Sequence, residues 1–421
     1  MDDHGERRIG RRELLKSAAG TAAALTLGPA LGGPAAAQGR ELKVGFLLPL
    51  TGGFAEAGQL HKRAVEMAVE EINAAGGVKS LGGAKIVALF GNSSSVDEAN
   101  TETERLIARE KAIAIIGAYS SGATISSSVI AERAAIPYVV PNALADEITG
   151  RGLKYVFKSV PHFSQFAINS GELVRELSRT ARVEAKTACL VRENNFFGNV
   201  VGREFAKHMP QFALKVVTDN IFPSNPTSFE DVILKLKGDA PDVVFAAGEP
   251  SSITLLFQQL NELRYWPKLG WVGVGGGYSN PITWKNLGKL ADGLVVVNDW
   301  FPEIKRPGAT EVNARFKART GVDMLGNANT TYAGVYIVHA ALEKAASTEG
   351  PKIREALAAL DLTSGVPLFM YERVKFDDKG FMTYAKLVGA QVRDGQARVV
   401  WPGTLKVTDA VWPVPDWSKR A

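Results

Sequence analysis

The chain has 421 residues, a formal net charge of +5 and 22% charged residues. Its basic residues are spread without a run of five or six, so the charge pattern indicates no nucleic-acid partner and no membrane-surface partner. The only cysteine, Cys189, excludes an internal disulfide and is predicted to be a buried structural thiol. The length beyond the N-terminal segment exceeds the roughly 300 residues at which one core stops growing, which predicts two domains.

Residues 1–37 are predicted to be an export signal and not part of a domain. The segment contains Arg11-Arg12-Glu13-Leu14-Leu15-Lys16, a weakly apolar stretch over residues 17–31, and Ala35-Ala36-Ala37 at the expected cleavage point. The adjacent arginines resemble the twin-arginine signal, and an ordinary secretory signal is the alternative. Neither this stretch nor a later one reaches the about 20 apolar residues that span a bilayer, so we expect an exported protein with no direct membrane span.

From residue 42 the sequence alternates short apolar runs with longer amphipathic segments, a pattern typical of βαβ units and a parallel sheet. The first series predicts strands at residues 42–48, 85–90, 112–117, 136–140 and 155–159, with helices over 60–72, 97–109 and 121–134. The second series predicts helices over 166–180, 200–208, 228–237 and 251–263, with strands at 187–191, 213–217, 242–246 and 270–274. Two such series predict an α/β protein with two doubly wound lobes.

The last hundred residues change character. Helices are predicted over residues 310–319, 332–346 and 352–360, and strands over 374–376, 385–392 and 398–401. Such an order does not form a third domain readily, but it fits a chain that returns to the first lobe and then to the second.

Short motifs occur in a fixed order along this pattern. They include Gly45-Phe46-Leu47-Leu48-Pro49-Leu50-Thr51-Gly52, Glu71-Ile72-Asn73-Ala74-Ala75-Gly76-Gly77, Ile116-Gly117-Ala118-Tyr119-Ser120-Ser121-Gly122, Ala135-Ile136-Pro137, Phe197-Gly198, Thr331-Tyr332-Ala333-Gly334 and Phe376-Asp377-Asp378-Lys379-Gly380. Their order over residues 42–401 resembles the periplasmic leucine/isoleucine/valine-binding protein family, the type I substrate-binding proteins of ABC importers.

The resemblance implies a type I periplasmic binding protein fold, in which two Rossmann-like lobes are joined by three crossings and close on a ligand like a hinge. Both lobes would then be discontinuous. The N-terminal lobe would comprise residues 41–160 with 299–368, and the C-terminal lobe residues 161–298 with 369–421.

One candidate site follows a buried strand and opens a helix at Ser120-Ser121-Gly122. Free backbone N–H groups and the positive end of a helix dipole favour a carboxylate at such a place, and the hydroxyl groups add donors. A simple capping role for Ser120 or Ser121 is the alternative. The resemblance implies that Ser121 contacts the ligand carboxylate and that Tyr119 and Ser120 line the same edge.

The resemblance also places Asn142, Ala143 and Leu144 at a segment that contacts the ligand, with Asn142 in a backbone role. Leu144 stands where many members have Thr or Ser. Gly275 stands where amino-acid binders carry the acid that pairs with the α-ammonium group. Since a buried ammonium without a counter-charge is costly, either another acid substitutes or the ligand lacks an ammonium group. Glu249 is the leading substitute, and a solvated loop charge is its alternative interpretation.

Aromatic residues are candidates for the remaining wall. The resemblance implies that Phe197 packs on the ligand, whereas Phe196 could equally be part of the core. Weaker candidates are Phe54, Tyr119, His162, Tyr278 and Trp300. An apolar pocket with a few placed donors suits a hydrophobic acid.

Enzyme motifs are absent from the sequence. It has no Gly-x-Ser-x-Gly, no phosphate-binding Gly-Lys-Ser/Thr and no His-Glu-x-x-His, so we expect neither catalysis nor a metal or cofactor. The run Gly273-Val274-Gly275-Gly276-Gly277 lacks the nucleotide-loop spacing, and Asn280-Pro281 is expected to interrupt the chain rather than to open a helix.

We therefore expect a periplasmic protein that binds a small hydrophobic carboxylate or a hydrophobic amino acid and delivers it to ABC importer permease subunits. A strict branched-chain amino acid binder and a ligand-sensing partner of a receptor are the alternatives. Neighbouring permease and ATPase genes would favour import, whereas a neighbouring kinase gene would favour sensing.

Overall fold

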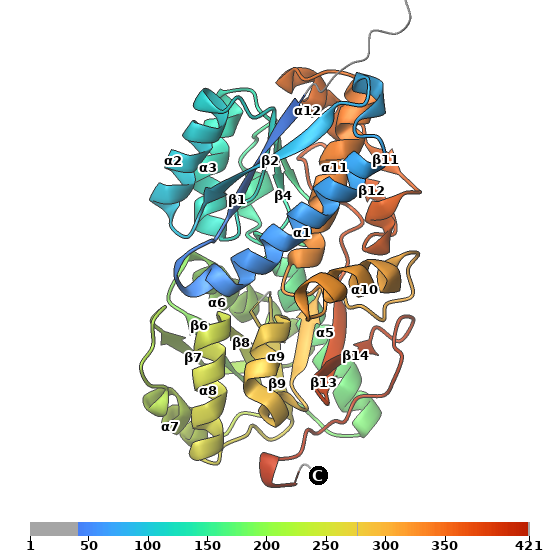
Figure 1. The fold of residues 1–421 in the computed structure, drawn as a ribbon. Helices are drawn as coiled ribbons and strands as arrows, with labels where there is room; N and C mark the ends of the chain where they lie inside the picture. Colours follow the sequence, from blue (N-terminus) through green and yellow to red (C-terminus); the bar gives the residue numbers. More distant parts are fainter. Residues whose placement is uncertain (1–40, 276, 420–421) are drawn as a thin grey trace, which may run out of the picture. The chain divides into compact units, whose positions relative to one another are not determined.

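The computed structural model describes residues 41–275 and 277–419, so the predicted export signal lies outside the described part of the chain. A five-stranded parallel sheet has the order β2-β1-β3-β4-β5 (Figure 1). Its strands are β1 (Glu41–Leu48), β2 (Lys85–Asn92), β3 (Ala114–Ile116), β4 (Tyr138–Val140) and β5 (Val156–Lys158). The connecting helices are α1 (Ala55–Ala74), α2 (Val96–Glu104) with a π-helical turn at Arg105–Arg109, α3 (Ser121–Arg133) and the short α4 (Glu147–Gly150).

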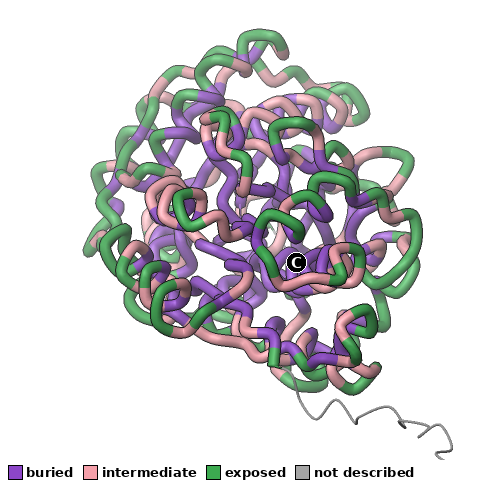
Figure 2. Tube along the Cα trace, turned by 90° about the horizontal axis from the view of Figure 1, so that it is seen from above, coloured by how far each residue is buried: buried purple, intermediate pink, exposed green. Residues whose placement is uncertain are grey.

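Both faces of this first sheet are buried, as a parallel sheet requires. In β1, Val44 and Phe46 pack into one hydrophobic cluster, whereas Leu47 packs into another together with Ile115 of β3. This is why the strands read as continuous apolar runs in the sequence. The buried residues gather in the interior, with exposed positions around them (Figure 2).

A second sheet has seven strands in the order β14-β13-β10-β9-β8-β6-β7. Its parallel strands are β6 (Thr187–Glu193), β7 (Lys215–Phe222), β8 (Val243–Ala247), β9 (Gly270–Val274) and β10 (Val295–Asn298); β13 (Val388–Arg393) and β14 (Gln396–Trp401) are antiparallel. Its helices are α5 (Phe163–Ala181), α6 (Phe196–His208), α7 (Glu230–Asp239), α8 (Pro250–Glu262) and α9 (Pro281–Leu287).

The expectation that Asn280-Pro281 would interrupt the chain is wrong, because these residues open α9. The Asn280 side chain accepts a hydrogen bond from the Ile282 N–H at 2.9 Å. Pro281 takes the first helical position, where a missing N–H and a fixed φ do no harm. The sequence prediction also missed β10.

The chain then returns to the first lobe through α10 (Ala309–Thr320), α11 (Ala328–Ala345) and α12 (Gly350–Ala358). Both α10 and α11 pack on α1, and the orange and blue helices lie side by side in Figure 1. Two short strands, β11 (Asp361–Leu362) and β12 (Val374–Lys375), pair before the chain enters β13 of the second sheet. These passages confirm the predicted architecture of two lobes and three crossings.

The residue-level lobe boundaries stay a prediction, and one of them is better placed elsewhere. Phe381 bridges to Lys158 of β5, and the Phe376 ring packs edge-on against Phe157 with the ring centroids 5.3 Å apart. Residues 374–382 therefore lie beside the first sheet. We propose that the third crossing falls between Met382 and Val388 and not at residue 368.

Within the described residues, no helix is long and apolar enough to cross a membrane.

Candidate functional site

A cavity of about 380 Å³ lies where loops from the two sheets meet. Parallel α/β sheets bind ligands beyond the carboxyl ends of their strands, and most of the lining follows such strand ends. The first lobe contributes Thr51, Gly52, Gly53, Phe54, Ser94, Ser95, Val96, Tyr119, Ser120, Ser121, Gly122, Asn142, Ala143, Leu144 and Asn327. The second lobe contributes Glu193, Asn195, Phe196, Phe197, Ser224, Asn225, Glu249, Ser251 and Gly277.

One end of the cavity is the start of α3. The Ser120 hydroxyl accepts a hydrogen bond from the Ala123 N–H at 3.3 Å, so Ser120 does cap the helix. Ser121 is 2% exposed, and its hydroxyl accepts from the Ala145 N–H at 3.4 Å. The first N–H groups of a helix have no partner within the helix and attract anions. This end can therefore receive a carboxylate while Ser120 keeps its capping role.

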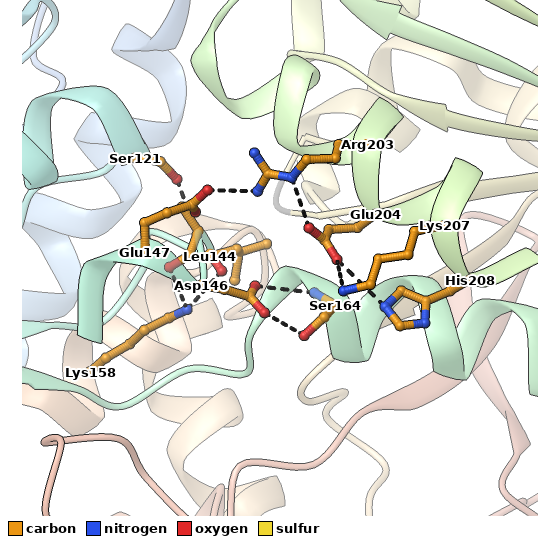
Figure 3. A network of polar contacts seen from close by, with 11 residues as sticks. Ser121, Leu144, Asp146, Glu147, Lys158, Ser164, Arg203, Glu204, Lys207 and His208 are labelled. Carbon is orange, nitrogen blue, oxygen red and sulfur yellow. Dashed lines mark hydrogen bonds and ion pairs between the residues drawn. The ribbon is translucent and has the colours of Figure 1, made fainter. Parts of the chain in front are cut away.

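The segment after β4 forms the adjoining wall and is held from behind by Lys158 (Figure 3). The buried Lys158 ammonium donates to the Leu144 carbonyl at 2.7 Å and to the Ala145 carbonyl at 3.1 Å. It also lies 3.0 Å from Nδ1 of His162. Burial lowers the pKa of Lys158 to about 7, and Asp146 partly opposes this shift. These contacts fix the backbone that faces the cavity.

The Asn142 side chain turns away into a buried polar cluster of the first lobe. It lies 2.9 Å from the Thr330 hydroxyl and close to Thr331. His61 belongs to the same cluster: its Nε2 lies 2.8 Å from the Gly326 carbonyl, and its Nδ1 lies 3.2 Å from the Thr331 hydroxyl. Only the backbone side of Asn142 is left for the cavity, in keeping with the predicted backbone role.

Two carboxyl groups of the second lobe also line the cavity. Glu193 ends β6 and is 1% exposed, and Glu249, which precedes α8, is 8% exposed. The Tyr119 hydroxyl of the first lobe donates to Glu249 Oε2 at 3.4 Å. Burial, and then the nearby Glu193, raise the pKa of Glu249 well above its usual value. Glu249 is thus a buried group of the cavity, which contradicts its interpretation as a solvated loop charge.

Phe197 and Gly275 are neighbours, and their contact leaves little room for a side chain at position 275. Gly275 has a left-handed φ of +84°, and a Cβ atom there would lie only 3.2 Å from Phe197 Cζ. A side chain at this position would require the ring to shift by a few tenths of an ångström and would strain the backbone. The Phe197 ring in turn packs perpendicular to Phe163, with the ring centroids 5.4 Å apart. Phe197 thus lies in the space beside Gly275 that such a side chain would need.

Part of the remaining wall is apolar. The Phe54 and Tyr119 ring centroids are 5.6 Å apart on the first lobe. Phe196 is 43% exposed, so its interpretation as a core residue is wrong. A Cβ atom on Gly122 would lie 3.6 Å from Phe196 Cβ and 3.7 Å from Val96, so the two lobes approach closely at this lip.

The structure brings nine of the predicted binding residues to the cavity: Tyr119, Ser120, Ser121, Gly122, Asn142, Ala143, Leu144, Phe197 and Glu249. Gly275 stands behind Phe197 and does not line it. Of the weaker candidates, Phe54 lines the cavity as well, whereas His162, Tyr278 and Trp300 lie elsewhere. Sequence reasoning missed Glu193, although its position just beyond a buried strand was a usable signal.

No group of three or more His, Cys, Asp or Glu side chains in the described ranges is arranged to hold a metal ion.

The chain has two α/β lobes, and a cavity with polar lining groups lies beyond the carboxyl ends of their strands. This arrangement defines a ligand-binding protein of the type I periplasmic class. A family model described as periplasmic binding protein matches residues 41–397. The Leu/Ile/Val-binding protein homolog 7 of Brucella melitensis biotype 1 is 31% identical over 404 residues, covering 93% of this chain and 98% of that protein. The chain therefore belongs to the periplasmic binding protein family, among the substrate-binding proteins of ABC transporters of the branched-chain amino acid type.

Solved structures share the fold. The LivJ substrate-binding protein of Streptococcus pneumoniae, in complex with isoleucine, has a TM-score of 0.75 at 22% identity; the match covers 86% of this chain and all of that one. A solute-binding protein of R. palustris in complex with benzoate has a TM-score of 0.76 at 21% identity. The match covers 88% of this chain and 98% of that one. At these identities the likeness establishes the fold, and the family is one of binding proteins and not of enzymes.

Proposed function

We propose that the chain captures a small amino acid with an apolar side chain between its lobes and delivers it to the permease of an ABC importer. The observation that carries this proposal is the polarity of the cavity. Its lining offers the backbone N–H groups of Ser121 and Gly122 at the helix start, the Ser121 hydroxyl, and the buried Glu249 carboxyl. Those two kinds of group suit the carboxylate and the ammonium group of one ligand.

The sequence leaves two ligand classes open: an amino acid, and a carboxylate without an ammonium group. The position of Glu249 favours the first. Gly275 alone favours a carboxylate without an ammonium group. Glu249 supports the other class, because a carboxyl in the cavity would leave an ammonium-free acid facing a negative group. Among the described residues that line the cavity there is no Lys, Arg or His to attract a second carboxylate.

The apolar wall supports a hydrophobic side chain on the ligand. Phe54, Val96, Phe196 and Phe197 border the cavity from both lobes. Burial of such a side chain stabilises the complex by about 25 cal/mol per Å² of apolar surface. Because half of these residues belong to each lobe, the full gain arises only when the lobes are closed.

A benzoate-type acid is the second candidate. The aromatic lining supports it, and the R. palustris relative is solved with benzoate. An aromatic acid would keep the contacts at the α3 start, whereas Glu249 would then have to be protonated.

A thermal-shift screen of leucine, isoleucine and phenylalanine against 4-methylpentanoate, phenylacetate and benzoate tests the proposal. An excess of about a hundredfold over the dissociation constant stabilises the folded protein by about 2.7 kcal/mol. We expect this shift with amino acids and a smaller one with the acids. Stabilisation by the acids alone would overturn the amino-acid proposal, and no stabilisation by any of them would overturn the ligand class.

Export to the periplasm and delivery to a permease are part of the same proposal. The resemblance of residues 1–37 to a twin-arginine signal supports export, and membership of the family supports delivery. A receptor-linked sensor would bind the same ligand without supporting uptake. Loss of ligand uptake on gene deletion, restored by the wild-type chain, would distinguish import from sensing.

A further inference from the structure

Glu193 is the one cavity acid to which the amino-acid proposal assigns no role. It is 1% exposed, and its Oε2 atom is buried without a hydrogen-bond partner among the described residues. Ser224, Asn195 and the Glu249 backbone N–H act to lower the pKa of this carboxyl group. Glu193 and Glu249 follow the ends of the adjacent strands β6 and β8 and line the same cavity. A buried carboxyl oxygen without a hydrogen-bond partner is costly, which indicates that a proton or a ligand group supplies the missing hydrogen bond.

Among the described residues that line the cavity, no cationic side chain pairs with either acid. The neighbouring Arg192 is directed elsewhere, because Asp219 and Asn199 accept its guanidinium hydrogen bonds at 2.7 to 3.0 Å. From the first lobe the pair faces the Tyr119 hydroxyl, and behind Tyr119 the His61 ring lies 5.4 Å away, centroid to centroid. Two adjacent buried carboxylates without a cation cannot both be ionised at low cost.

We propose that Glu193 and Glu249 form a carboxyl pair that holds one proton in the ligand-free protein and exchanges it for the ammonium group of the ligand. This inference rests on the proposed function and assigns Glu193 as a further specificity-determining residue. The exchange is balanced: the ammonium group enters, one carboxylic acid gives its proton to solvent water or buffer, and no covalent bond of the ligand changes. A ligand without a cationic group cannot drive this exchange.

The pKa values of both carboxyl groups are raised, which supports the pairing. Burial is the first cause that raises the pKa of Glu193, and burial followed by Glu193 raises the pKa of Glu249. Protons bound by the free protein and absent from the complex make binding tighter as pH rises. The affinity for an amino acid should therefore increase with pH until the pair is fully ionised.

Isothermal titration of L-leucine in two buffers of different ionisation enthalpy tests the exchange. At about pH 7 the wild-type protein should release a fraction of one proton for each leucine bound, and its affinity should rise by up to about tenfold per pH unit on the acid side. In Glu193→Gln the proton release should fall, because Glu249 then lacks the repulsion of a neighbouring carboxylate, although its burial still raises its pKa. Glu230→Gln, an exposed change on α7 with the same charge difference, should behave as wild type.

A measurement on the ligand-free protein separates this inference from the proposed function. The carboxyl carbons of ¹³C-labelled glutamate should show Glu249 titrating above the ordinary range, and this titration should shift to lower pH in Glu193→Gln. If leucine binds without proton release, or if the Glu249 titration is the same in both proteins, the inference is wrong. If no amino acid binds while the coupled titration is observed, the proposed function fails and the carboxyl pair stands.

Discussion

At the scale of the residue, the Ser121 hydroxyl is the most direct test of the carboxylate end. Replacing it by Ala removes a donor to a charged group, which contributes about 1.5–3 kcal/mol, so the affinity for leucine should fall about tenfold or more. Titration calorimetry would measure the change. Ser128→Ala alters a buried serine of the same helix that contacts Arg151, outside the cavity, and should keep wild-type affinity. Equal affinity in all three proteins would remove Ser121 from the site.

His61 should make the folded protein sensitive to acid. Burial lowers its pKa from 6.5 to about 4, although the Gly326 carbonyl opposes the shift. The folded state thus binds fewer protons than the unfolded chain between these two values, so stability is present above pH 6.5 and is lost as pH falls towards 4. The loss amounts to up to about 3 kcal/mol. Urea unfolding of wild type and His61→Gln across this window should show a shallower slope for the variant; identical slopes would contradict the assignment.

Individual residues also mark the limit of what the sequence could predict. The positions after strand ends follow from a regular βαβ rhythm, so nine of the ten proposed residues line one cavity. The relation between Gly275 and Phe197 is different, because they are far apart in the sequence and meet where the start of α6 packs on the loop after β9. No spacing rule reveals such a contact. The same holds for Glu193, whose importance depends on Glu249 lying beside it.

At the scale of the element, the segment over residues 142–147 depends on Lys158. Lys158→Met leaves the Leu144 and Ala145 carbonyls without their buried donor, so we expect lower stability and faster amide hydrogen exchange in this segment. Because the folded pKa of about 7 lies below the ordinary 10.5, wild-type stability should also rise with pH between these values.

The Met variant lacks the titrating amine and should lose that rise in stability. Lys235→Met, at an exposed position of α7, is the control that should keep it. Hydrogen exchange and urea unfolding at several pH values would measure both effects. An unchanged pH profile in Lys158→Met would contradict the buried-amine interpretation.

The elements themselves were mostly predictable where apolar periodicity and turn residues agree. The prediction ended too early at β9, because the glycine-rich stretch after Val274 hides both α9 and β10. Asn280-Pro281 was misinterpreted since proline breaks a helix interior yet favours a helix start. The β11–β12 pair joins segments separated by a loop, and only the tertiary contact shows that residues 374–382 belong beside β5.

At the scale of the whole molecule, the export route is open to a direct test. Replacing Arg11 and Arg12 together by Lys should leave the precursor in the cytoplasm, because the resemblance to a twin-arginine signal rests on this pair. Fractionation and immunoblotting would show where the protein accumulates. The double change of Arg7 and Arg8 to Lys keeps the pair and should not impair export. Normal export of the first variant would favour the ordinary secretory signal.

One ion pair between the lobes should make ligand capture depend on the salt concentration. Arg203 of α6 pairs with Glu147 of α4 at 2.6 Å and with Glu204 at 3.0 Å, and both Arg203 and Glu147 reach solvent (Figure 3). Exposed pairs contribute up to about 1 kcal/mol, and added salt weakens them as the screening length falls from about 10 Å at 0.1 M to about 3 Å at 1 M. Small ions equilibrate between the periplasm and the surroundings of the cell. In the proposed periplasmic location, capture should therefore weaken by up to a few-fold as external salinity rises towards about 1 M, so the same protein would scavenge most effectively in dilute water.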